Sequence, residues 1–331
     1  MIFIGIDISK DTFMAAFPKA NGYRTQSFKN DTKGILSFIQ KLDPEQHHCV
    51  MEATGNYGFL LLYLLEKKGI RASMVNPKQI KHFARMMLSV IKTDAKDACL
   101  IAMYGEKMNP EVYKMPSETI LLLKQKRTAI RLLMKQLKSM KNLREAMVPL
   151  PVQDKTVKKT ISSTIAFLEH QIKTLKDELN NLARKEFDQQ IEALTSIKGI
   201  GKTLASALVI ATGGFSYFEN SKQLSRYLGF CPTYQQSGTS VNIRGHINKD
   251  GETFLRSQLY VASWVAMRFN AECRNCYLRL RANGKPAKVA LVAVVNKLLR
   301  QAFAIVTTNS TYIDGYKSKA PFECKPELAI L

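Results

Sequence analysis

Near its amino terminus the chain reads Ile2-Phe3-Ile4-Gly5-Ile6-Asp7. The first five of these residues form an apolar run with the length and bulk of a strand buried on both faces. A carboxylate beside such a strand is costly unless it is paired or coordinates a cation. A second apolar run, Cys49-Val50-Met51, ends at Glu52, and the turn residues at 53–56 indicate that a helix follows. Two acids therefore stand at the ends of two predicted strands.

Two further carboxylates, Asp94 and Asp97, follow a predicted helix N-cap at Lys92-Thr93 and precede the apolar stretch 98–104. Their i, i+3 spacing places both on one helix face. Either acid alone is explained by the helix dipole, and Glu52 alone by capping of the next helix. Four clustered acids repel one another unless cations neutralise them or some stay protonated. We therefore predict that Asp7, Glu52, Asp94 and Asp97 hold a hard, oxygen-seeking cation, Mg²⁺ or Mn²⁺.

The charge of the chain indicates a polyanionic partner. Its 331 residues include 49 Lys and Arg against 27 Asp and Glu, a net charge of +22. A surface this basic gains affinity from counterions released along a phosphate backbone. An anionic membrane is the competing surface, but the apolar run near 59–65 is too short to span one and the run from Val289 is interrupted by Lys297 and Arg300. We predict nucleic acid as the partner and no membrane.

The expected compartment is the cytoplasm of a bacterial or archaeal cell, in association with the nucleoid. Asp7 and Lys10 come too early for the apolar core of a signal peptide. The six cysteines are scattered, as expected of reduced thiols. The pair Cys273 and Cys276 is a lone CxxC, for which two buried thiols on a helix are the favoured interpretation.

Up to about residue 105 the pattern alternates short strands with amphipathic helices. We predict strands near 2–8, 12–17 and 23–29, a helix at 32–42, a strand at 47–52, a helix at 57–68, a strand at 71–75 and then helices. This is the element order of the α/β ribonuclease H-like fold, in which acids on the first strand, the fourth strand and a late helix converge. The four carboxylates occupy those positions.

From 117 to about 185 the pattern changes to long helices. Apolar residues spaced 4, 3, 4, 3, 4, 3 form the a/d seam of a coiled coil, at Ile161, Ile165, Leu168, Ile172, Leu175, Leu179 and Leu182. A hairpin with the preceding helix and an intermolecular coil both fit. Between 121 and 160 eleven basic residues stand against two acidic ones, which favours a surface facing nucleic acid. The candidates there are Lys124, Arg127, Arg131, Lys135 and Lys138.

The third region, 191–318, is mainly helical, with helices expected at about 252–271 and 286–307. It opens with Ile197-Lys198-Gly199-Ile200-Gly201-Lys202, which resembles the hairpin of helix-hairpin-helix modules that offer backbone N–H groups to phosphate. Any tight turn between helices can also use two glycines. Residues 233–250 contain no long apolar run and are interpreted as a functional loop.

That loop contains Tyr234-Gln235-Gln236-Ser237-Gly238-Thr239-Ser240, and basic side chains follow at Arg244, His246, Lys249 and Arg256. An accessible serine near cationic groups has the ingredients of a nucleophile that attacks a phosphodiester. From the residues alone a turn-forming serine is the favoured interpretation. Tyr234 is an alternative nucleophile.

A set of short motifs, in this order, resembles the DEDD transposases of the insertion-sequence one-ten family, relatives of the Piv-type DNA invertases. The motifs are Gly5-Ile6-Asp7-Ile8-Ser9-Lys10, Met51-Glu52-Ala53-Thr54-Gly55-Asn56-Tyr57, Asn76-Pro77, Lys92-Thr93-Asp94-Ala95-Lys96-Asp97-Ala98, Gly199-Ile200-Gly201, Tyr227-Leu228-Gly229-Phe230-Cys231-Pro232 and Ser237-Gly238. One departure is Lys249-Asp250-Gly251-Glu252, where the family more often has glycine followed by asparagine or aspartate.

The resemblance implies a RuvC-like domain at 1–108, a helical coiled-coil linker at 109–190, a mainly α transposase domain with a catalytic serine loop at 191–318, and a tail at 319–331. By motif matching, the four acids are metal ligands and Ser237 is the covalent nucleophile. The implied partners are donor and target DNA, a non-coding guide (bridge) RNA transcribed from the element, and further copies of the chain in a dimer or tetramer. Our hypothesis is that serine and carboxylates form one composite site.

Two rival functions remain open from the sequence. In a RuvC-like nuclease or junction resolvase, metal-activated water is the nucleophile and Ser237 is structural. In a non-catalytic DNA- or RNA-binding scaffold, the fold is kept without the chemistry. Retention of all four acids argues against the scaffold, and formation of a covalent adduct separates the transposase from the resolvase.

Overall fold

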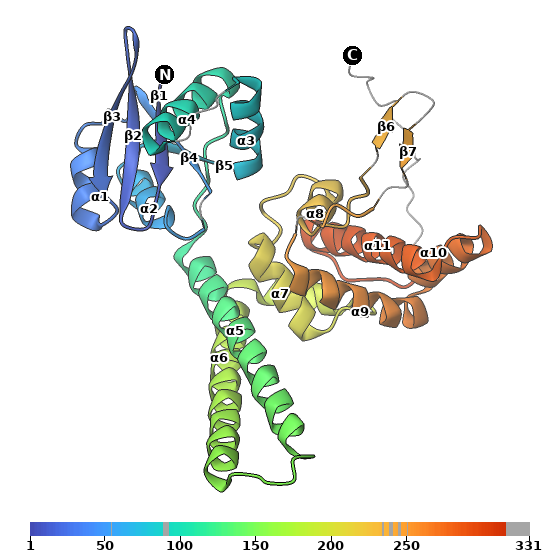
Figure 1. Ribbon diagram of the computed structural model, residues 1–331. Coiled ribbons are helices and arrows are strands. Elements are labelled where there is room, and N and C mark those ends of the chain that lie inside the picture. Colours follow the sequence, from blue (N-terminus) through green and yellow to red (C-terminus); the bar gives the residue numbers. More distant parts are fainter. Residues whose placement is uncertain are drawn as a thin grey trace. The chain divides into compact units, whose positions relative to one another are not determined.

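The computed structural model describes residues 1–53, 55–88, 93–233, 235–237, 241–243, 246–249 and 251–315 (Figure 1). The chain divides into two compact units, 1–116 and 117–331. The first unit is an α/β unit in which helices pack on a β-sheet, and the second unit is mostly helical.

Unit 1 is built on a five-stranded sheet in the order β3-β2-β1-β4-β5. The strand β1 is antiparallel to β2 and parallel to β4, so the sheet is mixed. All five predicted strands are confirmed, and the helix expected at 32–42 ends earlier, at Ile39. The elements are β1 (Ile2–Ile8), β2 (Thr12–Lys19), β3 (Gly22–Lys29), α1 (Thr32–Ile39), β4 (His47–Glu52), α2 (Phe59–Lys67), β5 (Arg71–Val75), α3 (Pro77–Met86) and α4 (Asp94–Met108).

Both faces of this sheet are covered, as the unbroken apolar run in β1 requires. Alternate residues of β1, Ile4 and Ile6, belong to one core cluster together with residues of α1 and α2. Phe3 faces the other way and clusters with Ile101 and Tyr104 of α4. Helix α4 therefore covers the face opposite to α1 and α2.

Gly5 is the point at which α4 comes closest to the sheet. A Cβ atom at Gly5 would lie 2.1 Å from the carbonyl oxygen of Ala98 and 2.2 Å from the amide nitrogen of Ala102. One helical turn further along α4, a Cβ at Gly105 would lie 2.8 Å from Cδ1 of Phe3. The helix therefore runs in the direction opposite to β1, and its first turn lies toward the carboxyl end of that strand.

We expect the substitution Gly5→Ala to destabilise unit 1 by about 3 kcal/mol, since the added methyl meets the backbone of α4 and the helix must shift. In Gly105→Ala the added methyl meets the side chains of Phe3 and Val50. Those side chains can move, and alanine favours the helix by roughly 1 kcal/mol, so the net effect is smaller. Urea denaturation of both variants measures the difference. Equal losses of stability in the two variants would show that the contact with the α4 backbone does not make Gly5 the more sensitive position.

A buried polar pair connects β4, β5 and the segment after α4. His48 Nε2 lies 2.7 Å from Ser73 Oγ, and the Ser73 hydroxyl donates to the carbonyl oxygen of Glu111 at 2.6 Å. Because that hydroxyl has one proton to give, Ser73 accepts from Nε2–H of His48. Burial, and then the charge of Arg71, lower the pKa of His48.

Unit 1 should therefore lose stability on mild acidification. Because its pKa is lowered, His48 takes up a proton at lower pH in the folded state than in the unfolded chain, where the ordinary pKa is about 6.5. Stability is thus present above that pH and falls below it, by at most about 1.4 kcal/mol per pH unit for one proton. The variant His48→Gln lacks this titration. Thermal unfolding of the wild type and of His48→Gln at pH 7 and pH 5 measures the contribution of His48. An equal loss of stability in both proteins between these pH values would contradict the prediction.

Unit 2 begins with two long helices, α5 (Glu118–Met147) and α6 (Lys155–Thr195), which pack as an antiparallel hairpin within one chain. Two ion pairs show the direction: Lys126 meets Glu178, and Lys141 Nζ lies 2.6 Å from Glu169 Oε1. The first four residues of the predicted seam, Ile161, Ile165, Leu168 and Ile172, are buried. Helix α6 is kinked at Phe187, where φ is −133° and ψ is 29°.

In the rest of unit 2, helix α11 packs against α6, α8, α9 and α10. The elements are α7 (Lys202–Thr212), α8 (Ser221–Tyr227), β6 (Gln235–Ser237), β7 (Val241–Ile243), α9 (Thr253–Phe269), α10 (Ala271–Ala282) and α11 (Ala287–Thr307). By length and composition α11 could cross a membrane. Part of this apolar helix is buried, since Val294, Val295 and Leu298 lie in the core of the unit. No membrane protein is indicated.

Three features of this region differ from the sequence-based expectation. Helix α10 follows α9 after a break at Asn270, whose side chain caps α10 by accepting from the amide of Cys273. Cys273 is buried but Cys276 is only half-buried, so the expectation of two buried thiols holds for one of them. The loop expected at 233–250 contains the antiparallel pair β6 and β7, in which Ser237 is opposite Val241.

Candidate active site

Asp7 and Glu52 lie at the carboxyl ends of two neighbouring parallel strands. Ile6 of β1 pairs with Met51 of β4, and the acids are the next residue along each strand. Side chains alternate between faces along a strand. Asp7 therefore shares the face of Phe3 and Gly5, and Glu52 the face of Val50, which is the face covered by α4. Both acids are half-buried.

The first turn of α4 brings the other two acids toward the same end of the sheet. Thr93 is the N-cap, as expected, and its hydroxyl accepts from the amide of Lys96 at 3.3 Å. Asp94 begins the helix and is exposed, whereas Asp97 is half-buried. Because the helix runs opposite to β1 and is closest to it at Gly5, its first turn lies toward the strand ends that carry Asp7 and Glu52.

The side chains themselves are not gathered into one ligand group. Within the part of the chain that the structure describes, no three His, Cys, Asp or Glu side chains are close enough to hold one metal ion. The course of the backbone brings the four acids toward one end of the sheet, and carboxylate oxygens are the kind of ligand that suits a hard divalent cation. Lys92, expected just before this turn, lies outside the described residues.

Ser237 is the last residue of β6. The segments that lead into β6 and out of β7, which form the base of this loop, are joined by backbone hydrogen bonds. The amide of Thr233 donates to the carbonyl oxygen of His246 at 2.7 Å, and the amide of Asn248 donates to that of Cys231 at 2.8 Å. Tyr234, Gly238, Thr239, Ser240, Arg244 and Asp250 lie outside the described residues. The structure thus describes the base of the serine loop and the backbone of both strands.

Arg256, one of the predicted nucleic-acid contacts, is directed at the backbone of this base. Its guanidinium donates to the carbonyl oxygen of Lys249 at 3.0 Å and also to that of Gly251. Gly251 has no room for a side chain, because a Cβ there would lie 2.4 Å from backbone atoms of Leu228 and of Tyr227. His246 and Lys249 are exposed on the same loop.

The basic residues of α5 fall into two groups. Lys135 and Lys138 are exposed along the hairpin, as a nucleic-acid surface requires. Lys124 is half-buried with its amine over the ring of Tyr217, 5.5 Å from the ring centre, and burial lowers its pKa. Arg127 and Arg131 both meet the carboxylate of Glu252.

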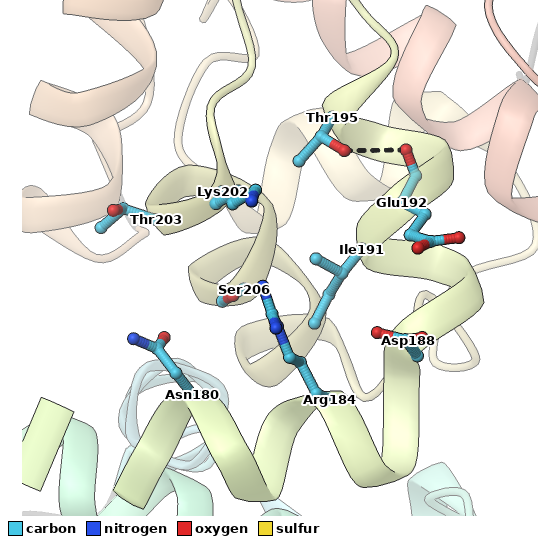
Figure 2. A pocket seen from close by; sticks show the side chains of 9 residues that line it. All are labelled: Asn180, Arg184, Asp188, Ile191, Glu192, Thr195, Lys202, Thr203 and Ser206. Atoms are coloured by element: carbon cyan, nitrogen blue, oxygen red, sulfur yellow. Dashed lines mark hydrogen bonds between the residues drawn. The ribbon is translucent and has the colours of Figure 1, made fainter. Parts of the chain in front are cut away.

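The turn between α6 and α7 carries the two lysines of the predicted phosphate-binding hairpin. Lys198 is exposed, and its amine lies 2.7 Å from a carboxylate oxygen of Asp314. Lys202 begins α7 and borders a cavity of about 370 Å³ beside the kink in α6 (Figure 2). Arg184 also reaches this cavity, but so do Asp188 and Glu192, so its mixed charge selects neither an anion nor a cation.

Sequence reasoning did not find the contacts of Arg127, Arg131 and Lys198. Each joins residues more than 100 positions apart, and both partners of each pair also fit an exposed surface. A run of basic residues carries no signal that separates a paired arginine from a free one.

Comparisons with known proteins find relatives over most of the chain. A family model described as "Transposase", for the DEDD transposases of IS110, matches residues 4–149, and a second, "Transposase IS116/IS110/IS902 family", matches residues 191–278. The pilin gene-inverting proteins of Moraxella bovis and Moraxella lacunata are each 30% identical over 94% of this chain and 97% of their own length. The transposase for insertion sequence element IS1111A of Coxiella burnetii is 28% identical over 42% of this chain and 38% of its own.

Proposed function

Because the chain belongs to the IS110 family of DEDD transposases, we propose that it catalyses RNA-guided strand exchange through Asp7, Glu52, Asp94 and Asp97 together with the nucleophile Ser237. It is a DNA transposase or recombinase, and its substrates are DNA. The observation that carries the catalytic proposal is the convergence of β1, β4 and the first turn of α4 on one end of the sheet.

The order β3-β2-β1-β4-β5, with three antiparallel strands followed by two parallel ones, supports a ribonuclease H-like first domain. We propose that the chain consists of a RuvC-like domain, a coiled-coil linker and a transposase domain. The regular burial along the first half of α6 supports the coiled-coil assignment.

The chemistry is an exchange of phosphodiester bonds. Oγ of Ser237 attacks the scissile phosphorus, an Oγ–P bond forms, and the bond from phosphorus to the leaving sugar oxygen breaks. The proton lost by the serine hydroxyl is balanced by the one that the sugar oxygen gains. The bond energy is kept in the phosphoserine link, so a second DNA end can reverse the step and be joined. When bound, a divalent cation supplies Lewis-acid stabilisation of the phosphoryl and leaving oxygens.

The protein residues have separable tasks in this scheme. The four carboxylates would hold Mg²⁺ or Mn²⁺. Exposed basic side chains at Lys135 and Lys138 support binding to phosphate backbones, and the net charge of +22 supports a partner with many phosphates. A non-coding RNA from the element would select donor and target, and the active species would be a dimer or tetramer.

A strand-exchange assay tests this function. Purified protein, an RNA transcribed from the flanking segment of its element, and two labelled DNA duplexes carrying the element junction and the target are mixed with Mg²⁺. We expect recombined DNA that disappears when EDTA is added or the RNA is left out. Recombination without RNA would refute the guidance, and cleavage without rejoining would favour the resolvase.

A further inference from the structure

The loop that carries Ser237 enters helix α9 through Glu252, and the side chain of Glu252 reaches across to helix α5. Its Oε2 lies 2.7 Å from Nη2 of Arg127, and its Oε1 accepts from Nη1 of Arg131 at 3.4 Å. The approach to Nη2 is not aligned for a hydrogen bond, so the attraction to Arg127 is that of an ion pair.

Capping does not account for this carboxylate. Glu252 is the N-cap residue of α9, yet its side chain accepts no hydrogen bond from the first turn of that helix. Short side chains such as Asp or Asn at this position ordinarily accept from the free amides of the helix start, which the longer Glu252 carboxylate does not do. Here it is directed away from them, at two arginines of another helix.

The surroundings strengthen the ion pair with Arg127. The Arg127 side chain is only 16% exposed, and that of Glu252 is 28% exposed. Apolar side chains of α5, α7 and α9, among them Ile130, Ile210 and Phe254, line the cavity beside the pair. Away from bulk water a charge pair attracts more strongly, and either partner left alone is costly.

Glu252 continues directly into the base of the serine loop. Gly251 is pressed against the backbone of Leu228 and Tyr227, and the guanidinium of Arg256 binds the carbonyl oxygens of Lys249 and Gly251. The bonds from Thr233 to His246 and from Asn248 to Cys231 then join the two sides of the loop. A series of contacts thus connects Arg127 to Thr233 and Asn248 at the base of the serine loop.

We propose that Arg127 and Glu252 are positioning residues, which hold the base of the serine loop against α5 and so fix the place of Ser237. This role rests on the proposed function of Ser237. It also assigns Arg127 to an internal contact of the protein and not to DNA. Misplacing a reacting atom by about 1 Å costs on the order of 100-fold in rate, so a loosened base should slow catalysis with little effect on DNA binding.

The test compares Glu252→Gln, Arg127→Met and Arg127→Lys with a matched control, Glu169→Gln. The control removes one carboxylate from another ion pair of α5, that with Lys141 at 2.6 Å. Three quantities are measured: the rate of covalent adduct formation at saturating DNA, the Kd for DNA, and hydrogen exchange of the Thr233 and Asn248 amides. Rates are normalised to the folded fraction of each protein.

For Glu252→Gln and Arg127→Met we expect the adduct rate to fall by about 10- to 100-fold, a Kd within about 3-fold of the wild type, and faster exchange at both amides. Arg127→Lys keeps the charge without the fork of donors and should recover part of the rate. Glu169→Gln should match the wild type in all three.

Wild-type rates in Glu252→Gln, or unchanged exchange at the loop base, would overturn the proposal. So would a loss confined to DNA affinity and seen only in Arg127→Met, because Arg127 would then be a DNA contact. If the wild type itself forms no adduct, the nucleophile assignment fails, and the exchange of the two amides alone decides whether the pair braces the loop.

Discussion

Ser237→Ala is expected to abolish the covalent protein–DNA adduct and to lower strand exchange by at least about 10³-fold, as loss of a nucleophile does in other covalent enzymes. Alanine removes only the oxygen that forms the bond to phosphorus. DNA binding should be unchanged, because the proposed phosphate contacts are those of basic side chains and not of Ser237. Denaturing gels with end-labelled DNA measure the adduct, and gel shifts measure the binding.

Ser257→Ala provides a matched control. Ser257 is an exposed serine on α9, and its hydroxyl donates to the carbonyl oxygen of Phe254 at 2.8 Å. This variant should form adduct at the wild-type rate. Persistence of the adduct in Ser237→Ala, together with its loss in Tyr234→Phe, would transfer the nucleophile to Tyr234.

Asp7→Asn is expected to remove strand cleavage with an effect of similar size. Asparagine keeps the shape but supplies no charge to a divalent cation, and loss of several kcal/mol of Lewis-acid stabilisation corresponds to about 10³-fold in rate. Asp97→Asn should behave alike, since the first turn of α4 lies toward the same end of the sheet. Cleavage of labelled DNA at saturating Mg²⁺ measures both.

Folding and metal binding can be separated in the same variants. In EDTA, thermal unfolding gives the stability of each variant without a bound cation. Added Mg²⁺ should raise the Tm of the wild type and not that of the variant, since a ligand stabilises only the state that binds it. Asp11→Asn, at an exposed acid of the turn after β1, should respond as the wild type does. Full cleavage by Asp7→Asn would remove this residue from the site.

The fold of unit 1 could be predicted because its elements carry strong local signals. The run Ile2–Ile6 is apolar throughout, since both faces of β1 are covered, and Thr93 is a capping residue in front of a helix. Because Asp7 and Glu52 stand at the ends of β1 and β4, their neighbouring positions could be predicted once these strands were recognised. The close approach at Gly5 could not be foreseen, because a glycine within a strand does not reveal which backbone lies over it.

Unit 2 was less predictable for a related reason. The spacing along α6 indicated a helical pair, but an intermolecular coil has the same pattern as the observed hairpin. Strands of three residues, such as β6 and β7, are too short to show alternation. The ion pair between Arg127 and Glu252 depends on tertiary packing between distant helices, so the basic run of α5 concealed it.

Mass spectrometry of the nuclease-trimmed adduct is the most direct test of the central claim that Ser237 and the carboxylates act in one reaction. We predict a nucleotide attached to the peptide that contains Ser237 in the wild type, and no modified peptide in Asp7→Asn under the same conditions with Mg²⁺. A nucleotide on any other residue, or an undiminished Ser237 adduct in Asp7→Asn, would contradict it.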